Sequence, residues 1–182
     1  LAQELDELNA QRRHIEADMQ QQASNILALL ETSQDNQMPK CVCLYHPDWH
    51  QGVVGIVASR IKEKWHRPAL VFAKGDAGTL KGSCRSIAGF HIRDALAAVD
   101  AQHPGLIIKF GGHAMAAGLT IQAHQLKRFS KLFNDIIEGE FEKNNIDNSI
   151  YIDGALKDSD PIPTLAQEVR RHVWGQSFPE PT

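Results

Sequence analysis

The sequence predicts an α/β fold, in which helices flank a mixed, mostly parallel sheet and a long helix comes first. Strand-like and helix-like segments alternate between residues 40 and 143, and residues 1–33 contain neither Gly nor Pro. No run of about 18 apolar residues occurs, which argues against a membrane-spanning helix. We expect a helix over residues 1–36, an α/β domain over 40–143, and a linker with the start of a further domain over 144–182.

Apolar side chains recur at three- and four-residue spacing through the first segment, as on one side of an amphipathic helix. They are Leu1, Leu5, Leu8, Ile15, Met19, Ile26 and Leu29. At 1.5 Å per residue the helix would reach about 50 Å, which suits a connector between domains. A helix that packs on the domain or dimerises fits the same pattern.

Short β-rich apolar runs predict strands in the remaining chain, and three-four spacing predicts helices. The expected strands cover residues 41–46, 68–73, 80–87, 106–110 and 118–121. The expected helices cover residues 52–65, 92–99 and 124–143. Further along, we expect a loop at 144–149, a strand at 150–156 and a short helix at 163–173.

Charge is unevenly distributed along the chain, although the formal net charge is only −3. Residues 1–49 hold three Lys and Arg against eight Asp and Glu, and residues 129–182 hold five against ten. Residues 50–128 hold 11 against four. Because the local field attracts a polyanion, this basic centre favours an anion site, unless the asymmetry only reflects solvated faces.

Residues 46–60 (HPDWHQGVVGIVASR) form the first of three segments suited to binding phosphate. His50, Gln51 and Gly52 precede an expected helix that starts near Gly52, and its free amides and dipole favour anions. Arg60, about two turns later, can bind a phosphate or a buried carboxylate. Capping or half-buried histidines would produce the same pattern.

Residues 81–86 (KGSCRS) form the second segment. Period-two alternation places Lys81, Ser83 and Arg85 on one face of a strand. A guanidinium with hydroxyl groups suits a phosphodiester, whose oxygens accept bidentate hydrogen bonds from Arg. A solvent-facing strand without a ligand is the alternative.

The third segment, KFGGHAMAAGLT, follows an apolar run. Gly111 and Gly112 can adopt backbone angles forbidden to other residues and expose successive amides as an anion-binding concavity. His113 would then begin a short helical turn and donate a hydrogen bond to phosphate. A glycine pair often makes a plain turn, so the prediction depends on the three segments together.

Other site chemistries find little support. Hydrolases that cut phosphodiesters with two metal ions hold them with several Asp and His residues, and no Asp-His-His cluster occurs. No P-loop or Gly-x-Ser-x-Gly elbow is present. Cys41, Cys43 and Cys84 are too few for a disulfide framework and indicate a reducing cytoplasm. We therefore expect neither catalytic nor metal-binding residues in this chain.

Three stretches carry a resemblance to a known family: HPDWHQGVVGIVASRIKEKWHRPALVFA, LKGSCRSIAGFHIRDAL and KFGGHAMAAGLTI. They resemble the RecJ family of single-strand-specific 5′→3′ DNA exonucleases, of the DHH/DHHA1 superfamily, in its DHHA1-type domain. The resemblance covers about residues 40–143. The first helix is similar to the connector from the catalytic DHH domain, and WGQSFPEP is similar to the start of an OB-like domain.

The resemblance implies a role in DNA repair and recombination for a cytoplasmic protein. Mn²⁺ or Mg²⁺ would be bound by the DHH domain, which these residues do not include, so this chain alone would be inactive. The partners implied are single-stranded DNA, single-strand-binding protein and a RecQ-type helicase. The residues implied to hold DNA phosphates are Ser83, Arg85, Ser86, Gly111, Gly112 and His113, with His50, Gln51, Gly52 and Arg60 carried over from the first segment.

Two alternatives remain open. Relatives in the same superfamily that cleave short oligonucleotides or dinucleotides also carry a Gly-Gly-His block. A nucleic-acid-binding module without catalytic activity would show the same basic centre.

Overall fold

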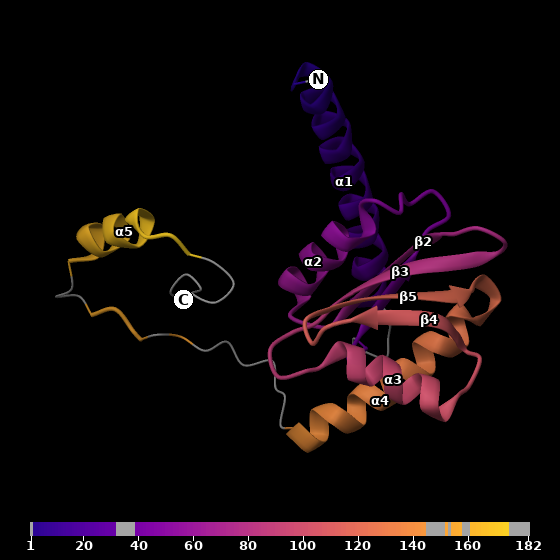
Figure 1. The fold of residues 1–182 in the computed structure, drawn as a ribbon. Coiled ribbons are helices and arrows are strands. Elements are labelled where there is room, and N and C mark those ends of the chain that lie inside the picture. The colour runs from indigo at the N-terminus through magenta and orange to yellow at the C-terminus, as the bar shows by residue number, and fades with distance from the viewer. Residues whose placement is uncertain (1, 32–38, 145–151, 153, 158–160, 175–182) are drawn as a thin grey trace. The chain divides into compact units, whose positions relative to one another are not determined.

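A computed structural model describes residues 2–31, 39–144, 152, 154–157 and 161–174. The chain divides into two compact units, residues 1–146 and 147–182. The helices of the first unit are α1 (Ala2–Glu31), α2 (Val54–Trp65), α3 (Ile92–Gln102), the 3₁₀ turn η1 (Ala123–Gln125) and α4 (Leu126–Asn144). Its strands are β1 (Val42–Tyr45), β2 (Ala69–Lys74), β3 (Thr79–Arg85), β4 (Ile107–Gly112) and β5 (Ala116–Gln122) (Figure 1).

The five strands form one sheet in the order β1-β2-β3-β5-β4. Only β1 and β2 are parallel, and the other three neighbouring pairs are antiparallel. The layered α/β fold with a mixed sheet is therefore confirmed, but a mostly parallel sheet was wrong. The reason is the length of the connections: short turns join β2 to β3 and β4 to β5, and a parallel pair needs a longer crossover such as α2.

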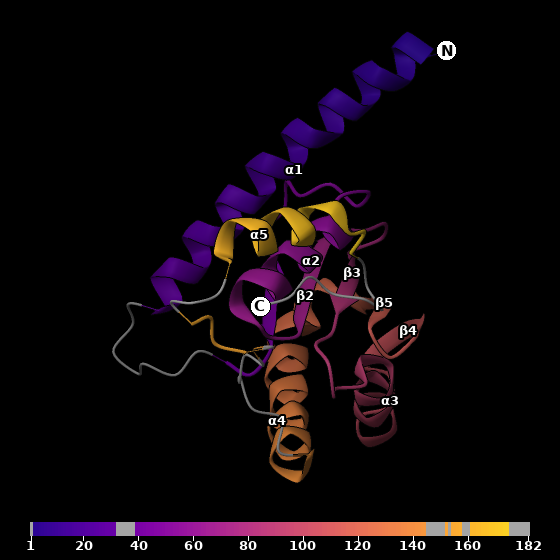
Figure 2. The same ribbon diagram turned by 90° about the vertical axis from the view of Figure 1, so that its left-hand side faces the viewer.

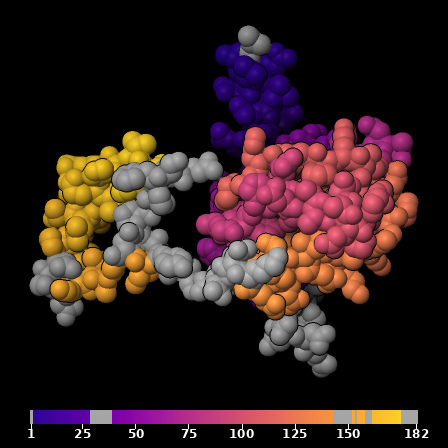
Figure 3. Space-filling model, turned by 60° about the horizontal axis from the view of Figure 1, so that its bottom comes forward, coloured from indigo at the N-terminus to yellow at the C-terminus, as the bar shows by residue number. Residues whose placement is uncertain are grey.

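Helices cover both faces of the sheet. α3 and α4 lie side by side on one face, and α1 and α2 lie on the other (Figures 1 and 2). In the space-filling view the side chains of α3 and α4 form a continuous surface (Figure 3). The core under α3 and α4 includes Phe72, Leu80, Leu96, Ile121, Phe129 and Phe133, and the core under α1 and α2 includes Leu27, Val42, Val57, Ile61 and Val71.

The first helix is confirmed over Ala2–Glu31, and the rest of the expected range, residues 1 and 32–36, lies outside the described residues. Its apolar seam has two environments. Met19, Ala23 and Leu27, spaced four residues apart, are buried in the core that α1 shares with α2. Leu5 and Leu8, on the earlier turns, are 53% and 55% exposed. Burial of only one end shows that the later turns of α1 belong to the folded domain.

Two further expectations about secondary structure were wrong. Of the expected strand at 150–156, Ile152 and residues 154–156 lie in no strand, and the other positions lie outside the described residues. A strand needs a hydrogen-bonded partner, and these residues have none among the described strands. Residues 113–117 do not form a helical turn, because β5 begins at Ala116 and pairs with both β3 and β4.

The second unit contains α5 (Ile162–Arg171), which confirms the helix expected at 163–173. Pro161 and Pro163 flank its first residue, where a missing amide costs no helical hydrogen bond. Residues 175–182, which carry most of the WGQSFPEP segment, lie outside the described residues. None of the described helices has the length and apolar character needed to cross a membrane.

Candidate nucleic-acid interface

One face of the sheet carries polar side chains and glycines along β3, β5 and β4. Ser83 of β3 pairs with Gly118 of β5, which pairs with Gly111 of β4. Residues directly opposite one another on neighbouring strands lie on the same face. The register therefore defines a set of residues that we name the open surface: Lys81, Ser83, Arg85, Lys109, Gly111, Ala116, Gly118 and Thr120.

Lys109, Gly111 and Gly118 of the open surface are exposed to solvent. On the same face, β1 and β2 lie under α1 and α2. The N-terminal turns of α2 also contact β3 near Ser83 and Arg85, so the open surface begins at the edge of this helical cover. The sequence correctly placed Lys81, Ser83 and Arg85 together, because strand alternation alone fixes their common face.

Arg85 is held in a fixed orientation by neutral groups. Its Nε donates to Ser59 Oγ of α2 at 3.1 Å, and its Nη1 donates to Cys84 O at 2.9 Å and to Ser83 Oγ at 3.3 Å. Ser59 Oγ in turn donates to Gly55 O at 3.1 Å. Sequence analysis missed Ser59, because only the folded structure brings α2 beside β3.

The N-terminus of α2 lies directly beside this guanidinium. A Cβ atom built on Gly55 would lie 3.0 Å from Arg85 Nη2 and 3.1 Å from Ser83 Oγ, so the glycine leaves room for both side chains. Val53 caps the helix without a side-chain hydrogen bond, and no acidic residue lies in the first turn. The amides of Val54 and Gly55 donate to no residue that the structure describes.

Charge around Arg85 is not balanced by an acid. No described Asp or Glu forms an ion pair with Arg85, and all of its hydrogen-bond acceptors are neutral. The positive end of the helix dipole adds to the same local charge. A half-buried guanidinium beside free helix amides is a site that favours an anion with several oxygen acceptors.

Two residues expected in the site have other roles. Ser86 is 1% exposed, and its Oγ donates to Phe90 O at 2.6 Å, so it stabilises the turn after β3 instead of facing the open surface. Arg60 Nη1 lies 3.4 Å from Glu63 Oε2, and Arg60 Nε lies 3.8 Å from Glu16 Oε1 of α1. Its guanidinium is therefore directed toward Glu16, whose side chain is only 15% exposed.

The two glycines of the third segment differ in what the fold requires. Gly112 has φ +145°, and a Cβ atom there would lie 2.4 Å from Ala116 O and from Ala117 Cα. A Cβ atom on Gly111 would meet nothing within 4 Å. The hairpin therefore requires Gly112, whereas nothing near Gly111 in this structure excludes a side chain.

His113 lies in the turn between β4 and β5 and is exposed. Its amide donates to Ala116 O at 2.7 Å, which closes the hairpin. The amide that directly follows the two glycines is therefore used by the hairpin itself. The exposed imidazole remains available to donate a hydrogen bond.

The residues before α2 form a loop fixed by local hydrogen bonds. Gly52 N donates to His50 Nδ1 at 3.1 Å, and Gln51 Nε2 donates to Lys74 O at 2.7 Å. The helix begins at Val54, two residues after the expected start near Gly52. All three loop residues are exposed, and the amides of Val54 and Gly55 are the free ones at the start of the helix.

Trp49 anchors this loop. The indole is 4% exposed and packs in the core under α1 and α2. Its Nε1 donates to Gln22 Oε1 of α1 at 2.9 Å. The long first helix is thereby connected to the loop that precedes the N-terminus of α2.

Two of the three cysteines, Cys41 and Cys84, are buried and poorly suited to reaction or metal binding. All three are free, and burial raises the pKa of both Cys41 and Cys84 well above the ordinary thiol value. Neutral thiols are weak nucleophiles and poor metal ligands. Across the described ranges, no group of three or more His, Cys, Asp or Glu side chains could hold a metal ion.

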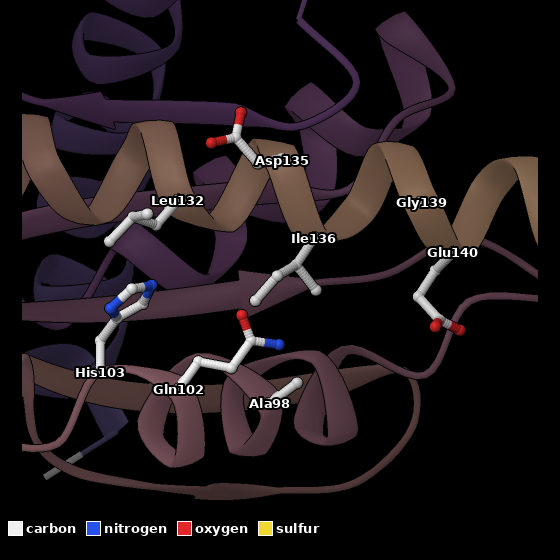
Figure 4. A pocket seen from close by; sticks show the side chains of 8 residues that line it. All are labelled: Ala98, Gln102, His103, Leu132, Asp135, Ile136, Gly139 and Glu140. Atoms are coloured by element: carbon white, nitrogen blue, oxygen red, sulfur yellow. The ribbon is translucent and has the colours of Figure 1, made fainter.

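A second candidate site lies between α3 and α4, on the opposite face. This groove has a volume of about 440 Å³. Leu132, Ile136 and Glu140 project from α4 toward α3, while Gln102 and His103 project from α3 (Figure 4). The groove lacks a Lys or Arg side chain in its lining, and the carboxylate of Glu140 would repel a phosphate. The open surface is therefore the stronger phosphate site.

Comparison with known proteins identifies the fold. The model of the DHHA1 domain matches residues 38–139. The chain belongs to the DHHA1 domain family. The single-stranded-DNA-specific exonuclease RecJ of Dickeya dadantii is 48% identical over 183 residues, covering 100% of this chain and 32% of that protein. The chain thus spans about a third of the length of the curated relatives it matches.

Solved structures agree with the DHHA1 assignment. RecJ from Thermus thermophilus in complex with Mg²⁺ superimposes with a TM-score of 0.69 at 27% identity, covering 98% of this chain and 26% of that one. Exonuclease RecJ bound to manganese gives a TM-score of 0.57 at 32% identity, covering 72% of this chain and 30% of that one. The resemblance to RecJ that the sequence blocks indicated is confirmed.

Proposed function

We propose that this chain is the DNA-holding part of a metal-dependent, single-strand-specific 5′→3′ DNA exonuclease of repair and recombination. Its open surface holds backbone phosphates opposite a catalytic DHH domain, and α1 connects the two domains. Support comes from the DHHA1 match, from relatives named RecJ, and from RecJ structures that contain Mg²⁺ or manganese. In this proposal the DHH domain binds the metal ion, and the chain by itself hydrolyses nothing.

The observation that carries the proposal is the unpaired guanidinium of Arg85 beside the N-terminus of α2. Arg85 Nη2 forms no hydrogen bond within the described part of the chain. A phosphodiester placed there would accept hydrogen bonds from this group and from the amides of Val54 and Gly55. Ser83 and His113 supply further donors at the edges of the open surface.

Ser86 and Arg60 have no direct role in this proposal, because their polar groups are already engaged within the fold. We place His50 and Gln51 at the margin of the open surface, where their exposed side chains can contact the bound DNA strand. Single-stranded DNA is the direct ligand, and single-strand-binding protein and a RecQ-type helicase are proposed partners. Three free cysteines agree with a reducing cytoplasm.

The test uses the complete protein that contains this chain, with Arg85→Ala, Arg85→Lys and a control, Arg128→Ala. Arg128 is exposed on α4, which packs on the opposite face of the sheet. Affinity for an oligothymidylate is measured in the presence of a chelator, and hydrolysis is measured with Mn²⁺.

We expect Arg85→Ala to weaken binding at least about 10-fold, because the variant cannot form charge-assisted bidentate hydrogen bonds with a phosphate. Arg85→Lys should recover only part of the affinity, because an ammonium lacks the planar fork. Arg128→Ala should change neither the affinity for the oligothymidylate nor the rate of hydrolysis. Unchanged binding and hydrolysis in a folded Arg85→Ala protein would contradict the proposed function.

A further inference from the structure

Strand pairing places Lys109 on the open surface. Lys109 lies opposite Thr120 in the same register that pairs Phe110 with Leu119 and Gly111 with Gly118. Because side chains alternate between the two faces of a strand, Lys109 and Gly111 share one face and Phe110 lies on the other. The register shifts only before Lys109, where Ile108 is left out of the pairing and Ile107 lies opposite Ile121.

Lys109, Thr120 and Lys81 form a row across β4, β5 and β3. Lys109 is exposed, and none of the described carboxylates forms an ion pair with it. Lys81 Nζ lies 3.6 Å from Asp76 Oδ2, but that carboxylate side chain is 94% exposed. An exposed pair of this kind contributes little free energy, so the Lys81 ammonium can exchange it for a phosphate.

The row lies at a fixed distance from the Arg85 site. Lys81 and Arg85 are four residues apart along β3, which corresponds to about 13 Å at the rise of an antiparallel strand. Ser83, Gly118 and Gly111 form the row between them, and the two glycines expose backbone beside the path. A stacked DNA strand carries a phosphate about every 3.4 Å of its axis, and an extended strand spaces them more widely, so about two to four phosphate-to-phosphate steps span this distance.

We propose that Lys81 and Lys109 form a second phosphate subsite, so that a single DNA strand runs along β3 from Arg85 toward Lys81. This inference rests on the proposed function, because it places the first phosphate at Arg85. It gives Lys81 and Lys109 a shared role that sequence analysis did not assign, and it makes affinity depend on the length of the strand. A dinucleotide occupies the Arg85 site alone, whereas a longer strand reaches both subsites.

The experiment compares a 5′-phosphorylated dithymidylate with a decathymidylate on the complete protein, in chelator to prevent hydrolysis. The test variant is the double change Lys81→Ala and Lys109→Ala. The matched control is Lys127→Ala with Lys131→Ala, which removes two exposed lysines from α4. A third variant, Lys81→Arg with Lys109→Arg, keeps both charges. Urea unfolding verifies that each protein is folded.

We expect the alanine pair to weaken decathymidylate binding about three- to thirtyfold and to leave dithymidylate binding unchanged. The slope of log affinity against log salt should become shallower by about 0.7 for each phosphate that the variant no longer neutralises. The double variant Lys81→Arg with Lys109→Arg should restore both the decathymidylate affinity and the salt slope. The control variant on α4 should bind like the unmodified protein. Arg85→Ala should weaken binding of both oligonucleotides.

The outcomes separate the two proposals. If Arg85→Ala weakens both oligonucleotides while the lysine pair changes neither, the second subsite is wrong and the proposed function stands. If the lysine pair loses affinity for the dinucleotide and for the longer strand equally, the second subsite is also wrong, because the effect would not depend on the length of the oligonucleotide. If Arg85→Ala changes neither oligonucleotide, the proposed function is wrong, and so is a path that begins at Arg85.

Discussion

Two halves of one sheet face differ in almost every property that packing controls. The half on β1 and β2 lies under α1 and α2, and its side chains are apolar, as in Val42 and Val71. The half on β3, β5 and β4 carries cations, hydroxyls and glycines. The boundary is sharp, because Val71 lies directly opposite Ser83 on the neighbouring strand. Helical cover therefore determines which half stabilises the fold and which half is available to a ligand.

Removal of side-chain volume from each half tests whether the two halves contribute differently to the free energy of unfolding. Ile61→Ala, in α2 over the covered half, should lower the free energy of unfolding by about 2–5 kcal/mol, because a buried side chain leaves a cavity. The matched change Ile108→Ala, at a residue that is 50% exposed, should cost less than about 0.5 kcal/mol. Urea unfolding monitored by circular dichroism measures both. Similar losses would show that the two halves contribute alike to stability.

The neighbouring glycines of β4 separate stability from binding within the open half. Gly112→Ala should cost at least about 1–3 kcal/mol of unfolding free energy, because its φ and its contacts with β5 exclude a Cβ atom. Gly111→Ala should leave the unfolding free energy nearly unchanged while weakening oligonucleotide binding, since the added methyl group occupies the open surface. Unfolding curves and binding titrations on both proteins separate the two effects. Equal destabilisation by both changes would contradict this division.

A smaller effect tests the link between the first helix and the loop before α2. Trp49→Phe should lower the unfolding free energy by about 1 kcal/mol, because the indole hydrogen bond to Gln22 is removed while most of the packing remains. A double-mutant cycle with Gln22→Ala isolates the hydrogen bond from the packing. Additive costs for the two single changes would show that the hydrogen bond contributes nothing.

Sequence patterns located most elements because each pattern reflects a local rule. Helices with long apolar stripes, such as 124–143, and strands with clear alternation were confirmed. Local rules also placed Ser83 beside Arg85. They failed at residues 113–117, where alanines favour a helix but pairing with two strands imposes an extended conformation.

Several features of the site depend on contacts between distant segments. Ser59 holds Arg85 only because α2 packs on β3, and Gly55 is required only by the side chains beneath it. The sequence could have indicated Gly118 as part of the open surface, since a glycine within a strand often marks a close approach of backbone or ligand. Strand alternation already places Lys109 on the face of Gly111, but only the pairing of β5 with β3 and β4 brings Lys109 into one row with Lys81.

Sequence patterns alone indicated the layered α/β class, the family, and the two segments that contain Arg85 and, further along, Gly111 with His113. These follow from periodicity and from short blocks of residues that are local in the chain. The antiparallel pairing of most strands, the contacts that engage Ser86 and Arg60, and the alignment of Lys109 with Lys81 become visible only in the folded structure. Strand pairing, burial and charge compensation are long-range properties, so no single segment of the chain contains them.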